Sequence, residues 1–162
     1  MAKLSSKIVP HLWFDKDALE PAKLYVSLVP DSRIDSVVPM PVDTPSGPAG
    51  SVQAVEFTLA GQQFVAFNGG PFDKFNHAIS FLIQCDDQKE IDALWEKLGQ
   101  GGSYEQCGWL KDRFGVSWQV APRQLADMMR DPDRAKAKRV AEAMMKMVKL
   151  DIAELKRAYE GK

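Results

Sequence analysis

The first part of the chain contains apolar segments with the spacing of one helix and several strands. A short apolar run over residues 8–14 predicts a strand, which ends at the polar residues that follow. Residues 18–29 carry apolar positions spaced as on one face of a helix, and Pro21 fits there because it falls in the first turn. Three further strands are predicted over residues 33–38, 51–59 and 62–67. The last two strands surround a glycine-containing turn, which indicates a hairpin.

The same order of elements begins again further along the chain. A strand is predicted over residues 78–85, and a helical pattern follows it. A shift of 70 residues places Leu12 on Leu82 and Tyr25 on Trp95. Three short strands complete this second set, over residues 104–107, 108–111 and 116–120. Because the order strand, helix, three strands recurs, the chain is predicted to contain two tandem modules.

Residues 122–162 differ in composition from the two modules. They are rich in Ala, Met, Lys, Arg and Glu, which favour helix. Asp131, Pro132 and Asp133 are expected to start one main helix. Its apolar residues at helical spacing are Val140, Met144, Met147, Val148 and Ile152. This face is expected to be buried, and the methionines either pack in the core or form an adaptable surface.

Composition and charge exclude several classes of function. The chain has 162 residues, of which 45% are hydrophobic and 27% charged, as in an ordinary soluble domain. Its 21 basic and 22 acidic side chains provide no net positive charge for nucleic acid, and no apolar segment reaches the roughly 18 residues of a membrane span. No secretory signal follows Met1, so a cytoplasmic location is expected. Cys85 and Cys107 are too few for a disulfide framework or a zinc site, and reduced structural thiols are expected.

Several segments resemble a known superfamily. The tandem modules and the turn DRFGVSWQV resemble the vicinal oxygen chelate superfamily, which contains glyoxalase I, bleomycin-resistance proteins and extradiol dioxygenases. Its PhnB-like branch, often labelled 3-demethylubiquinone-9 3-methyltransferase, is similar to the segments HLWFDKDALEPAKLYVSLVPDSRI, FTLAGQQFVAFNGGPFDKFNHAISFLIQCDDQKEIDALW, CGWLKDRFGVSWQVAP and MMKMVKLDIAELKRAYEG. The resemblance implies an α+β fold in which tandem βαβββ modules form an open, barrel-like cavity. It implies one domain over residues 1–162, made of modules 1–70 and 71–122 and a C-terminal helical extension, 123–162.

Superfamily enzymes place two metal ligands in each module, a His or Gln in the first strand and a Glu in the last. The resemblance places these positions at Pro10, Ser80, Gln119 and within residues 65–68, so the usual ligands of a divalent metal are absent. His11 and His77 are alternative metal ligands, although each is more simply a structural or surface histidine. The cofactor is therefore unknown from the sequence.

Two candidate residues depend on the face of the strand that they occupy. His11 alternates with Leu12 and Phe14, and we expect it to point toward the helix side of the sheet. Glu56 is an acidic residue within the apolar strand at residues 51–59. It is either a general base that faces the cavity or a surface residue.

The expected cavity has six candidate ligand-binding residues: Asn68, Asn76, Ser80, Gln84, Trp109 and Gln119. Phe14, Phe81 and Trp118 either line the cavity with Trp109 or pack in the core. A methyltransferase that uses S-adenosylmethionine commonly needs a glycine-rich loop after a parallel strand. The glycines within residues 68–71 and 99–102 do not have that placement.

Three hypotheses about function follow from these patterns. The first is a homodimeric PhnB-like protein that binds a small molecule in the cavity between the modules, without the usual metal quartet. The second is an enzyme, either a metal-dependent lyase or isomerase that uses His11, Glu56 and His77 or the quinone methyltransferase of the family label. The third is a protein whose cavity is filled by side chains and that acts through its dimer or its C-terminal helix surface.

Overall fold

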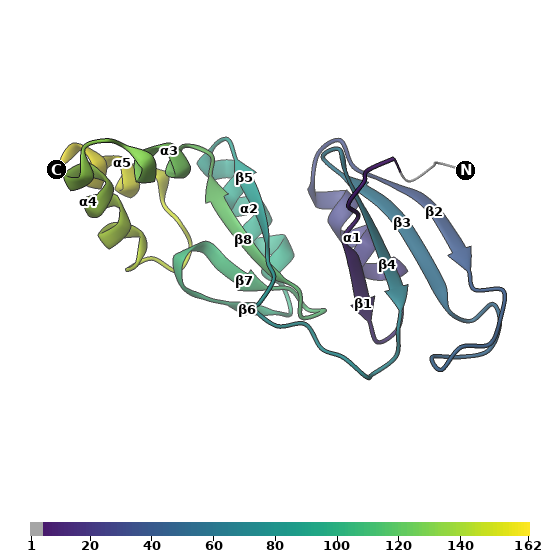
Figure 1. Ribbon diagram of the computed structural model, residues 1–162. Helices are drawn as coiled ribbons and strands as arrows, with labels where there is room; N and C mark the ends of the chain where they lie inside the picture. Colours follow the sequence, from purple (N-terminus) through teal and green to yellow (C-terminus); the bar gives the residue numbers. More distant parts are fainter. Residues whose placement is uncertain (1–4) are drawn as a thin grey trace. The chain divides into compact units, whose positions relative to one another are not determined.

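A computed structural model describes residues 5–162 of the chain (Figure 1). Its residues form two compact units, and the boundary between them in the chain lies between Phe75 and Asn76. Each unit contains a four-stranded sheet, and the second unit also contains the C-terminal helices.

The first unit consists of a helix packed on a mixed sheet. Its elements in chain order are β1 (His11–Phe14), α1 (Leu19–Leu28), β2 (Arg33–Pro39), β3 (Gln53–Leu59) and β4 (Gln62–Asn68). The sheet order is β1-β4-β3-β2, in which β1 runs parallel to β4 and the other neighbours are antiparallel. The predicted helix and the predicted hairpin are confirmed.

The second unit repeats this arrangement. Its first elements are β5 (Phe81–Cys85), α2 (Gln88–Gly99), β6 (Ser103–Tyr104), the short 3-10 turn η1 (Gln106–Gly108), β7 (Trp109–Lys111) and β8 (Ser117–Pro122). The sheet order is β5-β8-β7-β6, in which β5 runs parallel to β8, as β1 does to β4 in the first unit. The predicted α+β fold with a repeated strand and helix order is therefore confirmed. The strand predicted over residues 104–107 is shorter, because Cys107 adopts a left-handed turn with a φ of 59°.

The shift of 70 residues that suggested the repeat pairs equivalent positions in the two helices, but it pairs positions on opposite faces in the first strands. Tyr25 and Trp95 are both buried, at 1% and 9% exposure. Leu12 is 4% exposed, whereas Leu82 is 51% exposed on the other face of its sheet. The match in the strands is shifted by an odd number of residues, and such a shift moves a side chain to the opposite face.

Apolar side chains of α1 and one face of the first sheet form the core of the first unit. Tyr25 on α1 is buried, and its ring centroid lies 6.4 Å from that of Phe57 on β3. Leu12 and Phe14 on β1 are buried on the same side of the sheet. Because side chains alternate along a strand, the residues between them face the opposite, open side.

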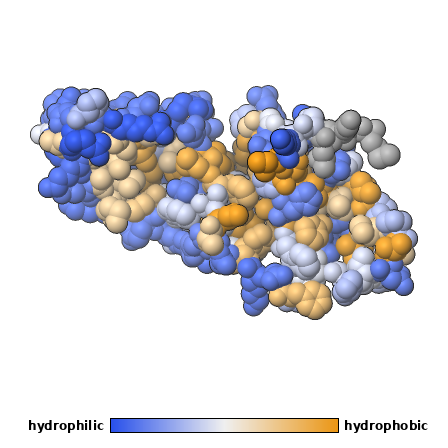
Figure 2. All heavy atoms as spheres, viewed as in Figure 1, coloured by the Kyte–Doolittle hydropathy of each residue, from blue (hydrophilic) through white to orange (hydrophobic). Residues whose placement is uncertain are grey.

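The single main helix predicted at the C-terminus is wrong. The segment instead forms α3 (Gln124–Arg130), α4 (Arg134–Met144) and α5 (Ile152–Glu160). Asp133 caps α4 as predicted, with its carboxylate accepting from the Ala135 N–H at 3.0 Å. Hydrophilic residues cover much of the visible surface of these helices (Figure 2). Within residues 5–162, none of the helices is long and apolar enough to cross a membrane.

Tertiary hydrogen bonds and a second cap account for the break between α4 and α5. The N–H groups of Cys107 and Gly108 donate to the carbonyl oxygens of Met147 and Val148 at 2.9 and 2.8 Å. Asp151 then caps α5, accepting from a first-turn N–H at 2.9 Å. As a result, Val148 is 41% exposed instead of buried, while Met147 remains in the core.

Candidate functional site

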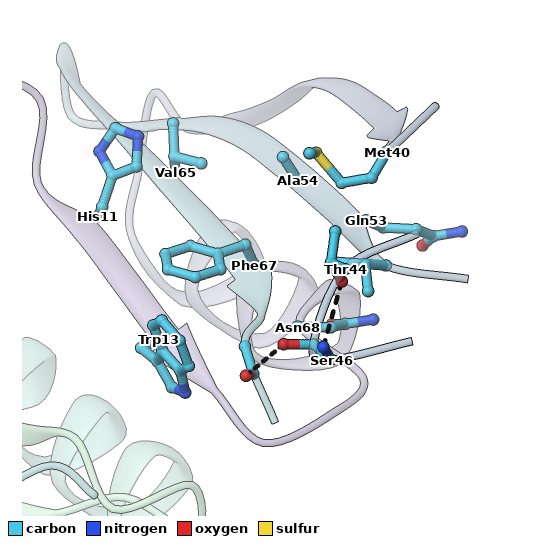
Figure 3. A pocket seen from close by; sticks show the side chains of 12 residues that line it. His11, Trp13, Met40, Thr44, Ser46, Gln53, Ala54, Val65, Phe67 and Asn68 are labelled. Carbon is cyan, nitrogen blue, oxygen red and sulfur yellow. Dashed lines mark hydrogen bonds between the residues drawn. The ribbon is translucent and has the colours of Figure 1, made fainter. Parts of the chain in front are cut away.

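A pocket of about 330 Å³ opens on the face of the first sheet that α1 does not cover (Figure 3). Ala54 on β3 and Val65 and Phe67 on β4 form its floor. Residues of β1 form one wall, and the loop between β2 and β3 forms the other. The loop contributes four lining residues, Met40, Thr44, Ser46 and Val52.

Strand register brings these residues together. Ala54 is in register with Phe67, and Phe67 is in register with Trp13 on β1. Neighbouring strands in a sheet lie about 4.8 Å apart, so the three side chains form one row across the open face. The Trp13 and Phe67 rings meet edge to face, with centroids 5.1 Å apart and planes at 73°.

Two glycines after β4 hold the Trp13 ring in place. Trp13 Nε1 donates to the carbonyl oxygen of Gly70 at 2.9 Å. A Cβ atom on Gly69 would lie only 2.1 Å from Trp13 Cε2, so the ring packs directly on the glycine backbone. The chain continues beside β1 here, since Gly69 N donates to the Phe14 carbonyl oxygen at 2.7 Å. Trp13 is thus a fixed wall of the pocket.

His11 lies on the pocket side of β1, so the expectation that it points toward the helix is wrong. It lines the pocket beside Val65, and its ring meets that of Phe67 edge-on at 6.3 Å. The alternation with Leu12 is as predicted, but Leu12 is the residue that faces α1. This orientation is the expected one, because burying the polar imidazole would cost free energy while burying the apolar leucine is favourable.

Glu56 also lies on the open face of the sheet. It is in register with Val65 on β4 and with Ser36 on β2. Ser36 Oγ donates to Glu56 Oε2 at 2.6 Å. Because His11 is in register with Val65 from the other side, His11 and Glu56 flank Val65 on one face.

Asn68 has a structural role at the edge of the pocket. Its Oδ1 accepts from the Ala18 N–H at 2.7 Å, which satisfies a backbone donor at the start of α1. Asn68 also borders the pocket (Figure 3). The side chain therefore connects the position of α1 to the shape of the pocket.

The remaining candidate polar residues lie in the second unit and are bonded within it. Gln84 Oε1 accepts from Arg123 Nη1 at 3.0 Å. Asn76 Oδ1 accepts from the Ala78 N–H at 2.8 Å, which forms a local turn. These contacts account for both side chains without a ligand.

Trp109 and His77 lie next to each other in the second unit. Their ring centroids are 6.3 Å apart, and Trp109 is half-buried. His77 Nε2 lies 2.7 Å from Glu105 Oε2. His77 therefore has a carboxylate partner in its own unit.

The positions expected for the superfamily's metal ligands do not fit a divalent ion. Pro10 has no donor side chain, and its carbonyl oxygen accepts from the Val65 N–H at 3.0 Å. Gln119 Nε2 donates to Ser80 Oγ at 3.0 Å, so these two side chains bind each other. In the part of the chain that the structure describes, no three His, Cys, Asp or Glu side chains form a metal-binding group. No metal-dependent step follows from these residues.

The glycines do not fit S-adenosylmethionine either. The turns from β1 to α1 and from β5 to α2 contain aspartates and no glycine. Gly69 packs on Trp13, and a Cβ on Gly102 would lie 1.9 Å from the Lys111 carbonyl oxygen. Close packing inside each unit therefore explains these glycines without a cofactor.

Cys85 and two of the four candidate aromatic residues belong to the protein interior. Burial raises the pKa of the Cys85 thiol from 9.0 to about 12, so it is a poor nucleophile. Cys107 is half-buried and donates its S–H to Met145 Sδ at 3.6 Å. Phe14 and Trp118 are 4% and 3% exposed on the helix sides of their sheets, so core packing accounts for them.

Sequence reasoning did not identify Trp13, Met40 and Phe67 as site residues. The alternation around Trp13 contained the signal, because a residue between buried Leu12 and Phe14 must face the other side of the sheet. No pattern in the sequence indicated that the indole ring of Trp13 would pack on the backbone of Gly69.

The arrangement of both units defines the class of protein. Two strand-helix-three-strand units with the same strand order form the fold of the vicinal oxygen chelate superfamily. The fosfomycin resistance protein FosX from Mesorhizobium loti has this fold, with 12% identity, a TM-score of 0.50, and coverage of 73% of this chain and 91% of that chain. The protein PA1353 from Pseudomonas aeruginosa is similar in fold, with 23% identity, a TM-score of 0.55, and coverage of 73% and 98%.

Within this class, the chain belongs to the 3-demethylubiquinone-9 3-methyltransferase family, whose profile matches residues 6–121. A PhnB protein from Bacillus cereus is 33% identical, with a TM-score of 0.62 and coverage of 71% of this chain and 98% of that chain. A comparison with curated proteins found no match. The PhnB-like branch is therefore the one to which the chain belongs.

Proposed function

We propose that this chain binds a small, largely apolar molecule in the pocket of its first unit. The observation that carries the proposal is the Trp13 wall, which the backbone of Gly69 and Gly70 holds rigidly at the edge of an open, apolar floor. A concave site of a few hundred Å³ with an apolar lining and a few polar groups is typical of small-molecule sites. A preformed aromatic wall lowers the entropy cost of binding.

The lining favours an uncharged, planar ligand. Among residues 5–162, none of those that line the pocket is Lys, Arg, Asp or Glu. A charged ligand group would lose its hydration there without gaining an ionic partner, which is costly. Trp13 and Phe67 offer contact to a flat ring. The quinone ring in the family's name is of this kind, and the hydroxyl group of Thr44 and the amide group of Gln53 line the pocket and can orient ring substituents.

A second candidate function is proton transfer to such a ligand. It is supported by His11, which lines the pocket beside Val65, whereas Glu56 lies on the other side of Val65, on the same open face but outside the lining. A carboxylate and an imidazole are the side chains most often used for general acid and base catalysis. In this case His11→Gln would abolish turnover of a bound ligand and change its affinity much less.

Titration of isotope-labelled protein with naphthol and with a ubiquinone head group that lacks its tail tests the binding proposal by NMR. We expect chemical-shift changes at the Trp13 indole and the Phe67 amide, and a roughly tenfold lower affinity in Trp13→Ala. Trp109→Ala is the matched control, because Trp109 is a half-buried tryptophan of the second unit. Circular dichroism establishes that each variant is folded. Unchanged affinity in Trp13→Ala, or shifts confined to the second unit, would contradict the proposal.

A further inference from the structure

The loop between β2 and β3 forms one wall of the pocket and is held together by its own hydrogen bonds. At its base, Met40 N donates to the Val52 carbonyl oxygen at 2.8 Å, and Gly50 N donates to the Met40 carbonyl oxygen at 2.7 Å. At its tip, Thr44 and Gly47 exchange two backbone hydrogen bonds of 2.9 and 3.1 Å. A loop with such internal bonds can move as one body about a hinge at its base.

A side-chain hydrogen bond joins the tip of this loop to the opposite wall of the pocket. Ser46 Oγ donates to the Gly69 carbonyl oxygen at 2.6 Å (Figure 3). Gly69 is the residue on which the Trp13 ring packs. The Ser46 bond therefore connects the loop wall with the wall that holds Trp13.

Apolar packing holds the base of the loop more firmly than its outer part. Val52 at the base is 7% exposed, whereas Val42 further along is 57% exposed. Surface loops with few buried apolar contacts open at low free-energy cost. The Ser46 bond is therefore expected to contribute a large share of the free energy that keeps the tip in place.

We propose that this loop is a hinged flap at one side of the pocket and that the Ser46 hydroxyl is its latch. The inference rests on the proposed binding function, because it concerns how a ligand reaches the same pocket. A hydrogen bond of this kind changes an equilibrium by about fivefold. While the bond from Ser46 to Gly69 holds, the loop closes one side of the pocket, and ligand enters and leaves through the remaining opening more slowly than after the loop has moved outward.

Stopped-flow kinetics with naphthol as the probe tests the latch. In Ser46→Ala we expect the association and dissociation rate constants both to rise about fivefold, with the dissociation constant changing less than about twofold. Ser46→Thr, which keeps a hydroxyl, should restore slow exchange. Ser51→Ala is the matched control, because Ser51 Oγ bonds within the loop, to the Pro48 carbonyl oxygen at 2.6 Å. A rise in the dissociation rate constant alone would identify Ser46 as a ligand contact and overturn the latch.

A measurement on the ligand-free protein separates failure of the latch from failure of the binding proposal. Backbone NMR relaxation should show increased motion at Thr44 and Gly47 in Ser46→Ala and not in Ser51→Ala. Failure of the unmodified protein to bind naphthol or the quinone head group contradicts the binding proposal, while the relaxation data still test the flap. Unchanged relaxation in Ser46→Ala overturns the latch, whatever the binding result.

Discussion

Replacement of Gly69 by alanine is a direct test of how the pocket wall is built. The added methyl carbon would lie 2.1 Å from Trp13 Cε2 and 2.4 Å from Nε1. Ordinary contact begins near 3.4 Å, so the ring must move by about 1.3 Å or more. The φ of Gly69 is outside the left-handed region, and the backbone therefore accepts alanine without strain.

The expected cost follows from the contacts that the displaced ring loses. The bond from Trp13 Nε1 to the Gly70 carbonyl oxygen, 2.9 Å long, contributes about 1 kcal/mol. The edge-to-face contact with Phe67 at 5.1 Å contributes about 1 kcal/mol more. We therefore expect Gly69→Ala to lower the free energy of unfolding by about 2 kcal/mol, within the usual range for overpacking.

Urea denaturation followed by circular dichroism measures this loss, and a double-mutant cycle assigns its cause. In a Trp13→Ala background there is no ring to displace, so Gly69→Ala should cost less than about 0.5 kcal/mol. Naphthol binding should weaken in Gly69→Ala, as we also expect for Trp13→Ala. An equal loss of stability in both backgrounds would refute the reasoning, because the cost would then arise from something other than the indole ring.

Two further predictions concern the second unit. Asp112 is 2% exposed, and its carboxylate accepts from the N–H groups of Phe114 and Val116 and from Trp118 Nε1, at 2.8, 3.1 and 2.9 Å. Asp112→Ala should therefore lower the free energy of unfolding in urea by about 3 kcal/mol and Asp112→Asn by about half as much; equal losses would argue against this account. Because the pKa of Cys85 is raised from 9.0 to about 12, its contribution to stability is complete below pH 9 and is lost as the pH rises toward 12. Unfolding at pH 8 and pH 10 should show a decrease of about 1.3 kcal/mol that Cys85→Ala abolishes, and a decrease that persists in the variant would assign it to other groups.

The sequence predicted the elements better than it predicted the contacts between them. Helical spacing identified α1 and α2, because burial of one helix face requires apolar residues at that period. In the C-terminal segment the helical spacing of apolar residues continues past the end of α4, since Met147 is buried although it lies outside that helix. Hydrogen bonds from Cys107 and Gly108 to that segment determine where the helix breaks, and each joins residues 40 positions apart in the sequence. The spacing of residues within one segment cannot indicate a partner so distant in the sequence.

By itself, the sequence determined the repeated strand and helix order, the PhnB-like resemblance and the lack of the superfamily's usual metal ligands at the matching positions. Only the tertiary structure decided which face of β1 is open, and hence that His11 and Trp13 line a pocket while Leu12 is in the core. The physical reason is that alternation separates two faces of a strand without saying which one a helix covers. The pocket itself depends on parallel pairing of β1 with β4, which brings Gly69 against Trp13.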